Sequence, residues 1–222
     1  MNRSLHIVLF TVLVCWLADA GGQTNTEPRH QVGFNFMWLG AKFLRIENSP
    51  QIKAHPYLLS YKFITKKNLA YRFGLGGEYS KRGPNGSNTS KIDTLNRNVF
   101  LRMGVEKRFN LGKSWRFLAG GDLRFGHENQ RVKIPLPNGT PEEYYYANSR
   151  STHIGLAPVM GIEMIISPYI SLVTETALVY TYNTRFKEQG DTRYPVFNEK
   201  SSANFNKISV SLPLNLYITI KL

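Results

Sequence analysis

The last sixteen residues, 207–222, alternate between apolar side chains and mostly polar ones. The apolar positions are Ile208, Val210, Leu212, Leu214, Leu216, Ile218, Ile220 and Leu222. A period of two places all of these side chains on one face of an extended strand, whereas a helix would scatter them around its circumference. The segment therefore predicts a long β-strand with one apolar face and one polar face.

Seven earlier segments repeat this alternation less regularly. They lie at residues 32–38, 57–63, 69–79, 99–105, 115–125, 154–166 and 170–186. Short connections at 66–68, 110–113 and 167–168 alternate with long ones at 41–53, 80–96, 126–150 and 187–203. Eight strands joined in this way predict an all-β fold, an eight-stranded antiparallel up-and-down β-barrel with tight turns at one end and long loops at the other.

The N-terminus has the pattern of a secretory signal peptide. Arg3 precedes an almost wholly apolar run at 5–17, and Ala18-Asp19-Ala20 supplies the small residues of a cleavage site. We therefore expect a signal peptide at 1–20, a polar leader at 21–31 and the barrel at 32–222. The one cysteine, Cys15, lies in the expected signal peptide, which excludes an intrachain disulfide framework and a cysteine-based zinc site.

Charge and hydropathy narrow the choice of partners. The 222 residues include 28 Lys and Arg against 15 Asp and Glu, a formal net charge of +13. Because the chain is expected to leave the cytoplasm, nucleic acid is not the expected partner of this charge. No apolar run is long enough for a transmembrane helix. The mean hydropathy of −0.29 is compatible with a barrel that exposes lipid-facing side chains at every second position.

Alternation alone does not separate a transmembrane barrel from a soluble barrel whose apolar face surrounds a ligand. The bases on the polar face are mainly Arg, which forms bidentate pairs and suits enclosed sites better than Lys. We expect an interior charge network of Arg72, Glu78, Arg102, Glu106, Arg116, Asp122, Arg124, Glu163, Glu175 and Arg185. The apolar face then points to lipid, with aromatic girdles that include Trp38 and Tyr57 near the strand ends.

The signal peptide, the eight alternating strands, the turn and loop asymmetry and the amphipathic last strand resemble the small outer-membrane β-barrel proteins of Gram-negative bacteria. The pattern is most similar to the Bacteroidetes-type outer-membrane β-barrel domain family, and it covers nearly all of the mature chain. The resemblance implies a location in the cell outer membrane and insertion by the barrel-assembly machinery. One departure is the last residue, Leu222, where such barrels often end in an aromatic residue.

Some eight-stranded outer-membrane barrels are lipid-acting enzymes, which makes a serine esterase site the first alternative to test. Ser151 and His153 are neighbours on the polar face of one predicted strand, and Glu163 shares that face. Glu163 lies roughly 33 Å further along a straight strand, too far to orient the histidine. Glu128 on the adjoining strand is the remaining acid. We predict no catalytic residues, because the trio fails on geometry and its face points into the barrel.

A metal site is weakly supported. His127 and His153 lie near the loop ends of paired strands, and Glu128 is the one nearby acid that could join them. A zinc site needs more ligands than these residues supply. We therefore predict no metal and no other cofactor.

Two loop features indicate interactions. Tyr144, Tyr145 and Tyr146 are of a type enriched at recognition surfaces, although capping of the barrel or contact with lipid headgroups explains them equally well. Loop bases are expected to bind the phosphates of membrane lipid and glycolipid. These bases are Lys42, Arg45, Lys53, Lys81, Arg82, Lys91, Lys187, Arg193 and Lys200.

The expected function is a structural or interaction role in the outer membrane, with long extracellular loops displayed for adhesion or for contact with a larger envelope complex. Two alternatives stay open. One is a lipid-modifying enzyme, an acyl hydrolase or acyltransferase. The other is a narrow, anion-preferring pore, because an eight-stranded barrel has an interior that side chains can just fill.

Overall fold

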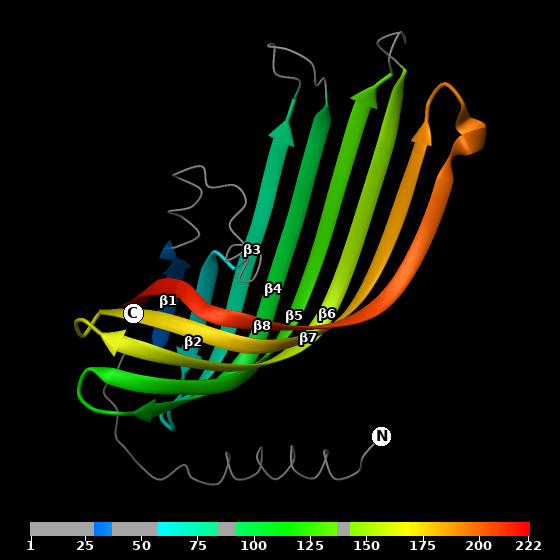
Figure 1. Ribbon diagram of the computed structural model, residues 1–222. Helices are drawn as coiled ribbons and strands as arrows, with labels where there is room; N and C mark the ends of the chain where they lie inside the picture. The colour runs from blue at the N-terminus through cyan, green and yellow to red at the C-terminus, as the bar shows by residue number, and fades with distance from the viewer. Residues whose placement is uncertain (1–28, 37–56, 84–91, 137–142) are drawn as a thin grey trace, which may run out of the picture.

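The computed structural model describes residues 29–36, 57–83, 92–136 and 143–222, and most of them belong to β-strands (Figure 1). The strands are β1 (His30–Asn35), β2 (Leu59–Ile64), β3 (Leu69–Arg82), β4 (Asp93–Asn110), β5 (Trp115–Pro135), β6 (Tyr144–Ile165), β7 (Ile170–Asp191) and β8 (Glu199–Lys221). A short 3₁₀-helix, η1 (Pro195–Phe197), lies between β7 and β8. The expected signal peptide and most of the expected leader lie outside the described residues, as does Trp38. Among the described residues, no helix is long and apolar enough to cross a membrane.

The strands form one closed ring. Each strand pairs antiparallel with the next in sequence, and β8 pairs with β1 to complete the ring. At this closure Gly33 lies opposite Thr219, and Phe34 lies opposite Ile218. Closure pairs the backbone groups that an open sheet leaves at its edges. The predicted all-β, eight-stranded, antiparallel up-and-down barrel is confirmed.

Tight turns occupy one end of the barrel. In the turn between β2 and β3, Asn68 adopts a left-handed conformation with φ of 57°, which Asn tolerates better than most residues. In the turn between β6 and β7, the Ser167 hydroxyl accepts hydrogen bonds from the backbone N–H groups of Tyr169 and Ile170. The start of β1 and the last residue, Leu222, lie at the same end of the barrel as these turns. The Leu222 N–H donates a hydrogen bond of 2.8 Å to the His30 carbonyl.

The strands differ greatly in length. β1 and β2 have 6 residues each, whereas β5 to β8 have 21 to 23. The long strands continue past the ring as a curved sheet on the side opposite the turns (Figure 1). The predicted loops at 80–96, 126–150 and 187–203 are therefore too long, because much of each is strand. Backbone pairing continues there although the apolar alternation has ended, since ladder hydrogen bonds do not require apolar side chains.

The pairing of β7 with β8 contains one irregularity. Glu175 lies opposite Asn215, but Ala177 lies opposite Ser211, so β8 has two extra residues at this point. Pro213, which has no backbone N–H to donate, lies in this interruption. Because an insertion of two preserves a period of two, the inward and outward faces of β8 are the same on both sides of it.

Candidate functional site

The barrel interior is unusually rich in buried charge. Eleven Asp, Glu, Lys and Arg side chains among the described residues are each at most 6% exposed. They are Lys62, Arg72, Arg102, Glu106, Arg108, Arg116, Asp122, Arg124, Glu163, Glu175 and Lys221. They come from seven of the eight strands, and each occupies the inward phase of its strand. This buried set is the candidate site, because it is the most distinctive chemistry in the fold.

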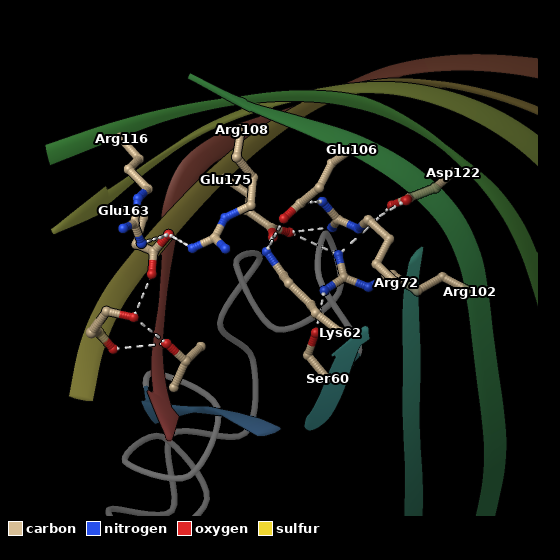
Figure 2. Close-up of polar contacts among 12 residues, drawn as sticks. Ser60, Lys62, Arg72, Arg102, Glu106, Arg108, Arg116, Asp122, Glu163 and Glu175 are labelled. Carbon is tan, nitrogen blue, oxygen red and sulfur yellow. Dashed lines mark hydrogen bonds and ion pairs between the residues drawn. The ribbon is translucent and has the colours of Figure 1, made fainter. Parts of the chain in front are cut away.

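Arg72 on β3 contacts three of the four buried acids (Figure 2). Its Nη1 donates to Glu106 Oε2 at 2.7 Å, and its Nη2 donates to Glu175 Oε2 at 2.7 Å. Its Nε lies 3.0 Å from Asp122 Oδ1. One planar guanidinium thus contacts acids from β4, β5 and β7, a geometry that suits Arg and that Lys cannot reproduce.

Two further bases surround the same acids. Lys62 Nζ on β2 donates to Glu106 Oε1 at 2.7 Å and lies 3.7 Å from Glu175 Oε1. Arg102 Nη1 donates to Glu175 Oε2 at 2.8 Å, and its Nη2 donates to Ser60 Oγ at 3.4 Å. Together with the contacts of Arg72, they join β2, β3, β4, β5 and β7 across the inside of the barrel. Because the partners are distant in sequence, the network forms only when the barrel has closed.

A second group of contacts gathers around Glu163, nearer the turns. Arg108 Nη2 donates to Glu163 Oε2 at 2.6 Å, and Arg116 Nη1 lies 3.6 Å from the same oxygen. Ser171 Oγ donates to Glu163 Oε1 at 2.7 Å, and Lys221 Nζ lies 3.5 Å from that oxygen. Lys221 links the last strand to this group. Lys62, Arg108 and Lys221 are buried here but are not among the ten residues predicted for the network. Their positions in the inward phase of β2, β4 and β8 were the available signal.

Apolar and aromatic side chains fill the rest of the interior. Small clusters comprise Leu118, Val173 and Tyr217, and Ala157, Val159, Ala177 and Val179. The assignment of Tyr57 to an outer aromatic girdle is wrong, because this residue is 2% exposed and lies inside. It precedes β2, so the strand phase does not govern it, and Arg102 and Arg124 hold their guanidinium carbons 4.9 and 5.6 Å from its ring centre.

Two glycines make room for the charged side chains. A Cβ atom at Gly74 would meet the Arg102 side chain, and a Cβ atom at Gly104 would meet the Asp122 carboxylate. Both glycines lie in the inward phase of their strands, opposite the strand positions that carry these long side chains. The inward glycines therefore supply the space that the network needs.

Two expected members lie apart from the buried network. Glu78 is half-buried, and its Oε2 accepts a hydrogen bond of 3.4 Å from Asn98 Nδ2. Arg185 is exposed, with its guanidinium carbon 5.4 Å from the Phe205 ring centre. Both residues lie toward the loop end, where the sheet opens past the ring. The other eight expected members are brought together inside the barrel.

The buried network carries excess positive charge. Seven of its members are bases and four are acids, so the described buried set has a net charge of +3. Among these bases, Arg124 lies furthest from an acidic partner, with its Nη2 3.8 Å from Asp122 Oδ2. Burial of unlike charges in such numbers is stabilising only where they are paired and hydrogen-bonded.

The outside of the barrel has the opposite character. Large apolar side chains in the outward phase are exposed on every strand. One example from each of β1 to β8 is Phe34, Tyr61, Phe73, Leu101, Leu123, Leu156, Leu178 and Ile208. The predicted assignment of inward and outward faces holds for these strands. The molecule therefore has charge inside and apolar surface outside, the reverse of a water-soluble globule.

The residues weighed for catalysis and metal binding do not converge. Glu163 belongs to the network near the turns, and the nearest acid to His153 is Glu128, with His153 Nδ1 4.0 Å from Glu128 Oε1. His127 instead contacts Thr152 Oγ1 at 2.9 Å on the outer face. Within the described residues, no group of three or more His, Cys, Asp or Glu side chains is placed to hold a metal ion.

The three tyrosines begin strand β6 instead of lying in a loop. All three are half-buried, and Lys133 Nζ lies 4.4 Å above the Tyr144 ring centre. The Tyr144 N–H donates to Thr192 Oγ1 at 2.9 Å. Nearby, Arg193 Nε donates to Glu143 Oε2 at 3.2 Å, and this hydrogen bonding raises the pKa of the Arg193 guanidinium. These contacts tie the β5–β6 hairpin to the connection after β7.

Of the bases expected in loops, Lys42, Arg45, Lys53 and Lys91 lie outside the described residues. Lys81, Lys187 and Lys200 instead belong to strands that extend past the ring.

Comparisons with known proteins identify no relative. No family model matches the chain, and searches of curated proteins and of solved structures find no significant match.

Proposed function

We propose that this chain is an outer-membrane β-barrel of a Gram-negative bacterium with a structural or interaction role. The observation that carries the proposal is the combination of a buried, ion-paired interior with an exposed apolar exterior. Charged side chains cannot face hydrocarbon without a large cost, whereas apolar side chains on every second position can. Signal-peptide export of the chain, with removal of residues 1–20, belongs to the same proposal.

The height of the apolar belt supports the membrane placement. On β4 the outward positions from Val99 to Phe109 are largely apolar, and on β6 those from Ile154 to Met164 are apolar. About eleven residues in a strand tilted by about 45° cross about 25 Å, which is the height of the lipid-facing band of such barrels. Polar residues follow at the loop end, with Arg97 on β4 and Thr152 on β6.

The interior favours an anchor over a pore. Arg72, Arg102 and their acidic partners cross the lumen from several walls, and Tyr57 and Tyr217 occupy space beside them. The barrel would thus fix the protein in lipid while the extended ends of β3 to β8 project from it. These ends and their connections, including Tyr144–Tyr146, are the surface proposed for a protein partner or for adhesion.

Fractionation of cells that express the full chain tests this function. The protein is expected in the outer-membrane fraction, to resist alkaline extraction and to begin after Ala20. Recovery in the soluble periplasmic fraction would contradict the membrane placement, whereas an intact N-terminus would contradict only the processing. Capture of envelope proteins with the full chain, compared with a variant in which Tyr144, Tyr145 and Tyr146 are replaced by Ser, tests the interaction role.

A further inference from the structure

The strand register aligns a row of side chains across the outer face of the projecting sheet. Tyr79, Arg97, Asn129, Arg150 and Phe186 lie side by side on β3 to β7. The next row toward the loops contains Lys81, Leu95, Arg131 and Asn148. The pairings of β3 with β4, β4 with β5 and β5 with β6 contain no register shift, so these residues keep the outward phase of the apolar belt below them.

This row marks the edge of the belt. The row directly below it contains Val99, His127 and Thr152. The row below that is apolar from β3 to β6, with Leu75, Leu101, Phe125 and Ile154. Tyr79 and Phe186 end the arginine row and are 67% and 37% exposed. Aromatic side chains at such a boundary are typical of the headgroup level of a bilayer.

Three arginines surround Asn129 on this face. Arg97 and Arg150 lie on either side of it, about 10 Å apart by two strand spacings. Arg131 is the diagonal neighbour of both, at about 7–8 Å. Side chains as long as arginine span these gaps, so the three guanidinium groups can meet at one ligand.

The cluster keeps its positive charge. Two acids lie near the cluster on the outer face, and each has a lysine beside it. Asp93 lies opposite Lys133 in the strand register. Glu188 Oε1 lies 3.2 Å from Lys200 Nζ. Within the described part of the chain, Arg97, Arg131 and Arg150 form no ion pair, and Arg97 has only its guanidinium carbon 5.9 Å from the Tyr79 ring centre. In the same two rows, β7 carries Phe186 and Glu188 and β8 carries Ser202 and Lys200, so these strands add no net charge to the rows. The charge is therefore concentrated on one side of the barrel.

We propose that Arg97, Arg131 and Arg150 form a binding site for the phosphate of an anionic lipid headgroup. The inference rests on the proposed membrane placement, which brings the headgroups to the level of this row. A guanidinium fork matches phosphate oxygens with two parallel hydrogen bonds, and three forks around one point suit a phosphate better than a single carboxylate. The belt below would hold the acyl chains, so the ligand is a lipid and not a soluble phosphate.

The test compares the full-length protein with the variant R97Q/R131Q/R150Q in nanodiscs of phosphatidylcholine with a minority of phosphatidylglycerol. After re-extraction, native mass spectrometry counts the phosphatidylglycerol retained on each protein. The variant is expected to lose retention about tenfold or more, because each base near a headgroup surface contributes appreciably to anionic lipid binding. The control variant K66Q/K67Q/K113Q removes the same charge from the turns and should retain the lipid.

The outcomes separate this inference from the proposed function. A protein that does not enter nanodiscs contradicts both. A protein that enters, but retains as much phosphatidylglycerol in the triple variant as in the wild type, contradicts only the lipid site. Equal loss in the control variant would also overturn it, because retention would then follow net charge. Glycerol phosphate is the second probe, and binding as tight as that of the lipid would replace the lipid with a soluble ligand.

Discussion

At the scale of single residues, the interior depends on arginine at position 72. Its guanidinium contacts Glu106, Glu175 and Asp122, and these three acids are themselves buried. Sequence reasoning placed these four residues inside, since each occupies the polar phase of a strand with apolar residues on the other face. The sequence did not predict which of these residues contact one another, because the contacts join different strands across the closed ring.

Arg72→Leu is expected to destabilise the barrel by about 3–5 kcal/mol, because it leaves buried acids without their shared partner. Unfolding by urea in the presence of lipid measures the change in free energy. Arg185→Leu is the matched control, since Arg185 is exposed and contacts the Phe205 ring. It should cost less than about 1 kcal/mol. Equal losses from the two substitutions would show that the network contributes nothing special to stability.

At the scale of strands, the period of two predicted which face of each strand is inward, but not where the strand ends. The fold, the turns and the orientation of Arg102, Arg116 and Glu163 follow from phase alone. The extension of β5 to Pro135 and the start of β6 at Tyr144 do not follow from phase, because apolar and polar residues no longer alternate regularly there. Tyr57 was misassigned for a related reason: it precedes the first hydrogen-bonded residue of β2, so the alternation no longer applies to it.

Two arginine substitutions on one face of β6 test the belt. Met160 lies near the middle of the apolar run and is 55% exposed, whereas Thr152 lies at its loop-side edge. Met160→Arg should destabilise the folded barrel in lipid by about 2–4 kcal/mol, and Thr152→Arg by about 0–1 kcal/mol. Refolding into vesicles over a urea series measures both. A similar small effect at both positions would indicate that the face meets water.

At the scale of the whole molecule, charged and aromatic side chains fill the lumen of the barrel, which is why we propose an anchor role. Ion pairs cross the lumen between strands and involve Lys62, Arg72, Glu106 and Glu175. The wider barrel of a porin instead encloses an aqueous channel. The net positive charge of the buried set adds a second barrier, directed against cations. A measurement of ion conductance therefore distinguishes the proposed anchor from the alternative, a narrow pore.

Planar-bilayer recording of the purified, folded protein should show no sustained conductance of porin size. Rare openings, if the network rearranges, should favour anions because the buried set is positive. The variant in which Arg72 and Glu106 are both replaced by Ala provides a comparison, since it removes side chains from the constriction without changing its net charge and should conduct more often. A large stable conductance in the wild type would mean that the lumen is open.

The most direct test of the inside-out architecture is a depth profile by spin labelling along β6. The mature chain as expected has no cysteine, so single cysteines can be introduced at outward positions 152, 154, 156, 160 and 162 and inward position 151 without background. For the protein in vesicles, we predict that labels at 156 and 160 collide with oxygen but not with a water-soluble nickel complex. The label at 152 should lie near the interface, and that at 151 should meet the nickel complex. Equal access of the nickel complex to all six positions would contradict a lipid-embedded barrel.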